Sequence, residues 1–200
     1  FGCVFGYSEP ALPVAIGGTI DLSRQSFSKN VSLNGEWEFY WNQLLEPGEK
    51  SLSESEMVDF PYRWTDEQST GKKYPSFGYA TYRLKIILPP GSESLQIALP
   101  DTYCSYRFYI NDLLSATNGK VGETEADTEP YWERKSVSTP VGTDTLHLTL
   151  QIANFLHQKL GINKPLVIGT ENQISRTSHM FESIDLLTKG CASMGGIFFL

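Results

Sequence analysis

The chain has 200 residues, of which 40% are hydrophobic, 20% charged and 12% aromatic, and this composition is typical of one folded domain with its own core. The formal net charge of -7 at pH 7 argues against nucleic acid or an anionic membrane surface as the partner, because both require a basic face. The 3 cysteines are widely spaced and predict neither a disulfide framework nor a metal site; Cys104 is expected to be buried and unreactive.

The first 17 residues are predicted to be the remnant of an export signal followed by a linker. Residues 1–6 are largely apolar, and the small Gly6 would suit a signal-peptidase cut before Tyr7. Residues 7–17 contain proline and alanine without periodicity. An alternative is that Gly2 and Cys3 belong to a lipoprotein cleavage site, and the sequence leaves open whether Cys3 carries a lipid.

Residues 18–170 are predicted to form an all-β domain. Apolar side chains recur at every second position within residues 37–41, 82–88, 95–99, 106–110 and 146–152. This period of two predicts strands with one buried face, and two such sheets must cover each other. No comparable helical pattern occurs between Thr19 and Ile168. We therefore expect a β-sandwich, with Trp37, Tyr82 and Phe108 in its core.

Three polar segments, 46–56, 65–75 and 118–133, are predicted to be long loops at the ends of the sandwich, where binding sites often lie. After Gly169 the spacing of Ile174, Phe181 and Ile184 predicts a stalk helix over residues 171–189. Residues 190–200 are uncharged and end in four large apolar side chains, which predicts the start of a first membrane-spanning helix. The alternative is a core helix that ends the domain.

The sequence contains no motif for catalysis, a metal or a cofactor. His147, His157 and His179 lack the spacing of metal ligands, and no nucleophile turn or glycine-rich phosphate loop is present. The carboxylates of the polar loops are expected to be solvated rather than paired across a scissile bond. The chain is therefore predicted not to be an enzyme and to bind no cofactor.

Aromatic and polar residues near the predicted loops and strand ends suggest a small-molecule site, because sugars stack on aromatic rings and hydrogen-bond to polar groups. The candidates are Trp64, Tyr79, Arg83, Arg107, Tyr131, Trp132, Asn154 and His157. Each has a plainer alternative: the aromatic rings could pack in the core, Arg83 and Arg107 could form surface salt bridges, and Asn154 could serve a turn.

Several motifs together resemble a known family. They are Leu-Asn-Gly-Glu-Trp-Glu-Phe-Tyr-Trp at 33–41, Phe-Pro-Tyr-Arg-Trp at 60–64 and Gly-Tyr-Ala-Thr-Tyr-Arg-Leu at 78–84, followed by residues 106–111, 119–122 and 152–155. In this order they resemble the extracellular domain of bacterial seven-transmembrane receptors with diverse intracellular signalling modules. The resemblance covers about residues 19–170, and residues 195–200 resemble that family's first membrane helix.

This resemblance implies a galactose-binding-like jelly roll outside the cytoplasm, attached to the cell membrane through the C-terminal helix. Such a domain would sense a small molecule, with carbohydrate as one candidate, and pass the signal to a cytoplasmic kinase or cyclase in a receptor that could be a homodimer. The same jelly roll is similar to the sugar-binding domain of family 2 glycoside hydrolases, which is the alternative function. A third alternative is a complete lipid-anchored binding protein. Fold similarity alone does not decide among them.

Overall fold

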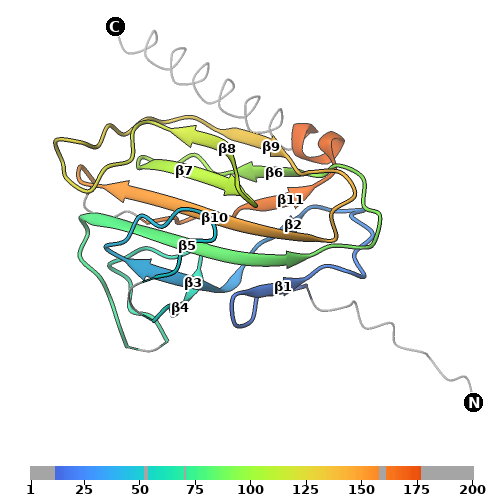
Figure 1. Ribbon diagram of the computed structural model, residues 1–200, viewed down its shortest axis with the longest axis horizontal. Helices are drawn as coiled ribbons and strands as arrows, with labels where there is room; N and C mark the ends of the chain where they lie inside the picture. Colours follow the sequence, from blue (N-terminus) through green and yellow to red (C-terminus); the bar gives the residue numbers. More distant parts are fainter. Residues whose placement is uncertain (1–11, 52–53, 70, 158–160, 177–200) are drawn as a thin grey trace, which may run out of the picture.

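The computed structural model describes residues 12–51, 54–69, 71–157 and 161–176. Its strands lie between Thr19 and Gly169 and form two sheets that face each other (Figure 1). The predicted β-sandwich is therefore confirmed. The predicted loops are also present, because no strand lies in 42–55, 61–77 or 119–134 of the described chain.

The larger sheet contains the two longest strands at its centre. Its order is β4 (Glu56–Phe60), β3 (Gly35–Trp41), β5 (Gly78–Ile87), β10 (Thr145–Asn154), β7 (Ser105–Ile110) and β8 (Leu113–Asn118), and β1 (Thr19–Asp21) pairs in parallel with the last part of β5. All other pairings in this sheet are antiparallel. The smaller sheet consists of β2 (Val31–Ser32), β11 (Val167–Gly169), β6 (Gln96–Leu99) and β9 (Lys135–Ser138).

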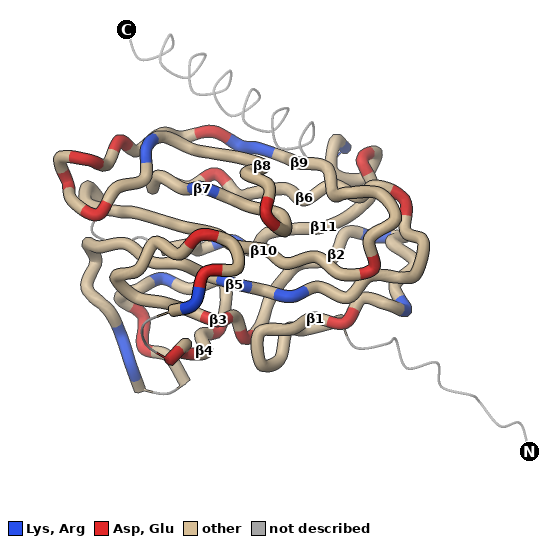
Figure 2. Tube along the Cα trace, viewed as in Figure 1, with Lys and Arg blue, Asp and Glu red and all other residues tan. Residues whose placement is uncertain are grey.

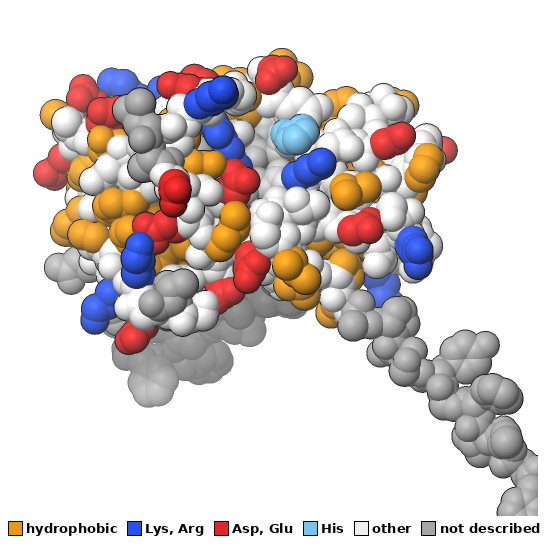
Figure 3. All heavy atoms as spheres, turned by 60° about the horizontal axis from the view of Figure 1, so that its bottom comes forward, with side chains coloured by type: hydrophobic (Ala, Val, Ile, Leu, Met, Phe, Trp, Pro, Cys, Tyr) orange, Lys and Arg blue, Asp and Glu red, His pale blue; other side chains and the backbone are white. Residues whose placement is uncertain are grey.

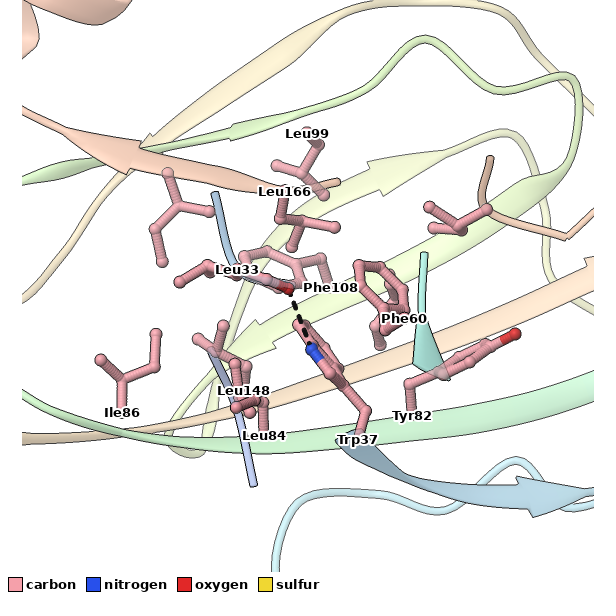
Figure 4. Close-up of a cluster of buried hydrophobic side chains, with 14 of the residues drawn as sticks. Leu33, Trp37, Phe60, Tyr82, Leu84, Ile86, Leu99, Phe108, Leu148 and Leu166 are labelled. Atoms are coloured by element: carbon pink, nitrogen blue, oxygen red, sulfur yellow. Dashed lines mark hydrogen bonds between the residues drawn. The ribbon is translucent and has the colours of Figure 1, made fainter. Parts of the chain in front are cut away.

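The core lies between the two sheets and follows the predicted alternation. In β5, Tyr82 and Leu84 are buried between the sheets, while Arg83 and Lys85 lie on the outer face. Trp37 is fully buried, stacks on Phe60 at 4.2 Å between ring centroids, and donates its indole N–H to the carbonyl of Leu33 at 3.1 Å (Figure 4). The indole N–H is thus paired where no water can reach it.

Four loops meet at one end of the sandwich. The register of the antiparallel pair β10 and β7 places Ala153 opposite Ser105, so the end of β10 lies beside the start of β7. The described parts of the connecting segments, 61–69, 71–77, 100–104, 119–134, 155–157 and 161–166, consequently gather at this end, on the left in Figure 1. We call it the loop end.

Residues 42–51 leave β3 at the same end but fold back over the outer face of the larger sheet. The backbone N–H of Leu45 donates to Oγ1 of Thr81 at 2.9 Å, and Nε2 of Gln151 donates to the carbonyl of Leu45 at 3.0 Å. Thr81 and Gln151 are fully buried although they lie on the outer face of the sheet. The loop therefore covers part of that face.

Residues 171–176, where the predicted stalk helix begins, are helical, and Ile174 is buried. The rest of that predicted helix, the membrane segment predicted at 190–200 and residues 1–11 of the predicted export remnant and linker lie outside the described residues. Within the described ranges, no helix has the length and apolar character that a membrane crossing requires.

Candidate functional site

Three aromatic side chains at the loop end form a cluster that we call the aromatic platform: Tyr103, Trp132 and His157. The rings of Tyr103 and Trp132 are stacked, with 5.5 Å between centroids and 13° between planes. The imidazole of His157 lies 5.2 Å from the ring of Tyr103 at a tilt of 49°. Tyr103 is 50% and Trp132 55% exposed. Exposed aromatic rings that contact one another are typical of a binding surface.

The platform combines residues from three parts of the chain. Tyr103 precedes β7, His157 follows β10, and Trp132 lies in the segment that joins β8 to β9. Because β10 pairs with β7 and β7 with β8, these three segments emerge side by side at the loop end. The platform thus depends on the register of the larger sheet.

Asn118, the last residue of β8, fastens two of these segments together. Its Nδ2 donates to the carbonyl of Cys104 at 2.9 Å and to that of Tyr131 at 2.6 Å, and it lies 3.5 Å from the carbonyl of Thr102. The side chain is 1% exposed. One buried amide therefore sets the spacing of the backbones that carry the two stacked rings.

We predict that Asn118→Ala lowers the free energy of unfolding by about 2–3 kcal/mol, because it leaves buried carbonyls unpaired. Urea unfolding measures this loss. Thr117→Ala is the matched control, since Thr117 is exposed on the same strand, and it should change the stability by less than about 0.5 kcal/mol. Equal effects of the two substitutions would contradict the role of Asn118.

Asn154 plays the corresponding part for His157. Its Nδ2 donates to the carbonyls of Ser76 at 2.7 Å and His157 at 2.8 Å, and its Oδ1 accepts from the backbone N–H of His157 at 3.2 Å. Asn154 is 2% exposed. The prediction that Asn154 contacts a ligand is thus corrected: it is buried because its amide closes the turn after β10, and it positions His157.

An ion-pair network joins the same segments next to the platform. Asp101 accepts from Nζ of Lys164 at 2.7 Å and from Nη2 of Arg134 at 3.3 Å. Burial alone would raise the pKa of Asp101, but the hydrogen bonds and charges of Lys164 and Arg134 outweigh it and hold the pKa below its usual value. The carboxylate is therefore charged at neutral pH and links the segments before β7, before β9 and before β11.

Asp101→Asn is expected to reduce the acid sensitivity of the fold. Because the folded-state pKa is lowered, the stabilisation by Asp101 is present above its unfolded pKa of about 3.9 and is lost as the pH falls through the folded value. The difference in unfolding free energy between wild type and variant should be largest at neutral pH and vanish once the pH has fallen below the folded-state pKa of Asp101. Denaturation at a series of pH values measures it, and a difference independent of pH would contradict this account.

Trp64 lies in the core, contrary to the prediction that it contacts a ligand. It is fully buried, its indole N–H donates to the hydroxyl of Tyr82 at 2.8 Å, and its ring meets that of Trp41 edge to face at 4.9 Å. The segment that follows β4 runs into the core. Trp64 is therefore buried although it lies between two polar stretches of the sequence.

Tyr79, Arg83 and Arg107 lie on the outer face of the larger sheet and not at the platform. Nη2 of Arg83 donates to the carbonyls of Glu46 and Glu49 at 2.8 and 2.9 Å. Arg107 donates to Oε1 of Gln151 at 3.3 Å and to the carbonyl of Val121 at 3.4 Å. Among the described residues neither arginine forms a salt bridge, so the alternative of surface ion pairs is not realised there. Both hold loops onto the sheet.

Tyr79 is half-buried beneath the same layer of loops. Burial, together with the hydrogen bond and charge of Glu123, raises the pKa of Tyr79 above its usual value. Tyr131 is 61% exposed, but the structure gives its ring no contact with the platform; its carbonyl is the acceptor for Asn118. Of the eight predicted residues, the structure brings together Trp132 and His157.

Acidic side chains gather in the loop that follows β8 (Figure 2). They are Glu123, Glu125, Asp127 and Glu129. The loop is closed by two backbone hydrogen bonds between Lys120 and Glu129, at 2.7 and 3.0 Å. Gly119 at its base has a φ of 63°, and a Cβ there would collide with the carbonyl of Glu129. This side of the loop end therefore favours neutral or cationic ligands over anionic ones.

No group of three or more metal-ligating side chains occurs in the part of the chain that the structure describes. Cys104 is fully buried, as predicted, and lies 2.7 Å from Oγ1 of Thr102. Burial raises the pKa of its thiol to about 11, so it stays protonated at neutral pH. The platform residues Tyr103, Trp132 and His157 can stack on a ligand and hydrogen-bond to it.

No protein-family model and no curated protein matches the sequence. Solved structures match the fold: a β-glucuronidase of Faecalibacterium prausnitzii (TM-score 0.50, 15% identity), a family 2 glycosyl hydrolase of Bacteroides cellulosilyticus (0.51, 14%) and a β-glucuronidase of Ruminococcus gnavus (0.50, 13%). Each alignment covers 70% of this chain but only 31%, 20% and 28% of the respective enzyme.

At this low identity the likeness shows the fold alone. The chain spans less than a third of the length of each enzyme. Of the two resemblances seen in the sequence, the one to a domain of family 2 glycoside hydrolases is confirmed at the level of the fold.

Proposed function

We propose that this chain is a non-catalytic carbohydrate-binding domain whose ligand stacks on the aromatic platform. The observation that carries the proposal is the pair of stacked, half-exposed rings of Tyr103 and Trp132, fixed by the buried amide of Asn118. Exposing aromatic surface to water is unfavourable in free energy, and a ligand that covers the surface removes this unfavourable term. Because the rings are already held in place, little conformational entropy is lost on binding.

The surroundings of the platform suit a sugar. The C–H face of a pyranose ring packs on an indole, while its hydroxyls need donors and acceptors at the edge. His157 supplies an imidazole within the platform, and Asp101 and Arg134 lie two residues from Tyr103 and Trp132, respectively. Asp101 and Arg134 form an ion pair. Either side chain can therefore hydrogen-bond to a sugar hydroxyl while its charge stays compensated by the other.

The wider role that we propose is ligand sensing outside the cytoplasm, in a membrane receptor with a kinase or cyclase output. The motif order described above supports this role, and a ligand would act by binding one of two receptor states more tightly. The alternative, an accessory domain of a glycoside hydrolase, is favoured by the solved structures of the same fold. The gene sequence that follows Leu200 separates them: successive apolar helices support the receptor, and a long soluble catalytic domain supports the hydrolase.

Calorimetric titration with a panel of neutral mono- and oligosaccharides tests the carbohydrate-binding proposal. We expect binding of at least one pyranose-containing ligand with a negative heat-capacity change, because apolar ring surface is buried. If no member of the panel binds at millimolar concentration, the proposal is wrong.

A further inference from the structure

A depression lies on the outer face of the larger sheet, away from the aromatic platform. Its volume is about 730 Å³, within the range of small-molecule sites. Its floor consists of side chains from β5 and β10, and its walls are Gly18 and Thr19, the loop residues Pro47 and Gly48, and the turn Asn111–Asp112. We call it the sheet groove.

The strand register places the basic groups of the floor side by side. His147 is the direct cross-strand neighbour of Lys85, and Thr149 is that of Arg83. Directly opposed residues on one face have Cβ atoms about 5 Å apart. Lys85 and His147 are both exposed. Viewed from the side of β1, β3 and β4, the surface shows an imidazole and basic side chains with acidic groups around them (Figure 3).

The groove is lined by basic groups in one part and by the acidic Glu38 in another. Glu38 lies opposite Arg83 in the register and accepts from the hydroxyl of Tyr40 at 2.8 Å. Among the described residues, Lys85, His147 and Glu38 have no ion-pair partner. One part of the groove therefore offers uncompensated donors, and the other offers acceptors.

Arg83 contributes a further unsatisfied donor. Its Nη2 is used by the loop carbonyls, but its Nε is buried and has no hydrogen-bond partner within the described structure. A buried donor without a partner costs free energy, and a ligand oxygen that reached it would remove that cost.

We propose that the sheet groove binds a carboxylate-bearing sugar, a uronic acid or the uronate end of an oligosaccharide. The carboxylate pairs with Lys85 and His147, which present two adjacent donors, and the hydroxyls meet Glu38 and Asp112. A ligand with one anionic group and several hydroxyls is the class that matches both the donors and the acceptors.

The test is a titration of the 200-residue chain with glucuronate and galacturonate, followed by backbone amide shifts in NMR, with glucose and galactose as neutral counterparts. We expect the uronates to shift the amides of residues 83–85 and 147–149. Lys85→Gln should weaken uronate binding about tenfold or more, the scale of one charge-assisted hydrogen bond. Thermal unfolding of Lys85→Gln confirms that the variant is folded.

Lys29→Gln is the matched control, because Lys29 is also exposed but does not line the groove, and it should leave uronate binding unchanged. Trp132→Ala should also leave it unchanged, which separates this site from the aromatic platform. Equal shifts from uronates and neutral sugars, equal affinity of Lys85→Gln and wild type, or no groove shifts at all would each overturn the proposal.

Discussion

Trp64→Ala is expected to lower the free energy of unfolding by about 3–5 kcal/mol, the usual range for a buried tryptophan. The substitution empties the space beside Trp41 and removes the donor to the Tyr82 hydroxyl, which then remains buried and unpaired. Urea unfolding should show a lower midpoint with an unchanged slope.

Two comparisons sharpen this prediction. Trp64→Phe keeps most of the volume but loses the hydrogen bond, so its loss should be smaller, about 1–3 kcal/mol. Trp132→Ala removes a ring that is 55% exposed and should cost at most about 1 kcal/mol. A Trp64→Ala variant as stable as Trp132→Ala would show that Trp64 is not a core residue.

Trp132→Ala is expected to weaken carbohydrate binding by about 10–100-fold, because it removes the ring surface that a pyranose would cover. Stability should change little, so the loss appears in the affinity alone. Phe77→Ala is the matched control: Phe77 is a 43% exposed aromatic residue outside the platform, and its removal should leave the affinity unchanged. Titration calorimetry measures both, and equal losses would contradict the platform.

The sheets could be predicted from the sequence where a strand has one apolar and one polar face. Residues 82–88 and 146–152 showed this alternation, and they lie mostly within β5 and β10. The strand β9 (Lys135–Ser138) could not be predicted in this way, because it lies at the edge of its sheet and its side chains are only partly buried. The two-residue strand β2 is too short to show any period.

The candidate site could be predicted only in part, because it depends on contacts between distant segments. The sequence indicates Trp132 and His157 as loop residues, but it does not indicate Tyr103, whose ring contacts both of theirs. Nothing near Tyr103 in the sequence indicates that β7 begins beside the end of β10. The roles of Asn118 and Asn154 could not be predicted either. An asparagine at a strand end suggests a turn, and only the fold shows which carbonyls its amide contacts.

The most direct test of the account uses the indole N–H signals of the 4 tryptophans in a carbohydrate titration followed by NMR. Trp37 and Trp64 are fully buried with their N–H groups bonded inside the protein, whereas Trp132 is more than half exposed on the platform. We predict that a bound oligosaccharide shifts the Trp132 signal and leaves those of Trp37 and Trp64 in place. Saturating ligand that leaves the Trp132 signal unmoved would contradict the proposed site.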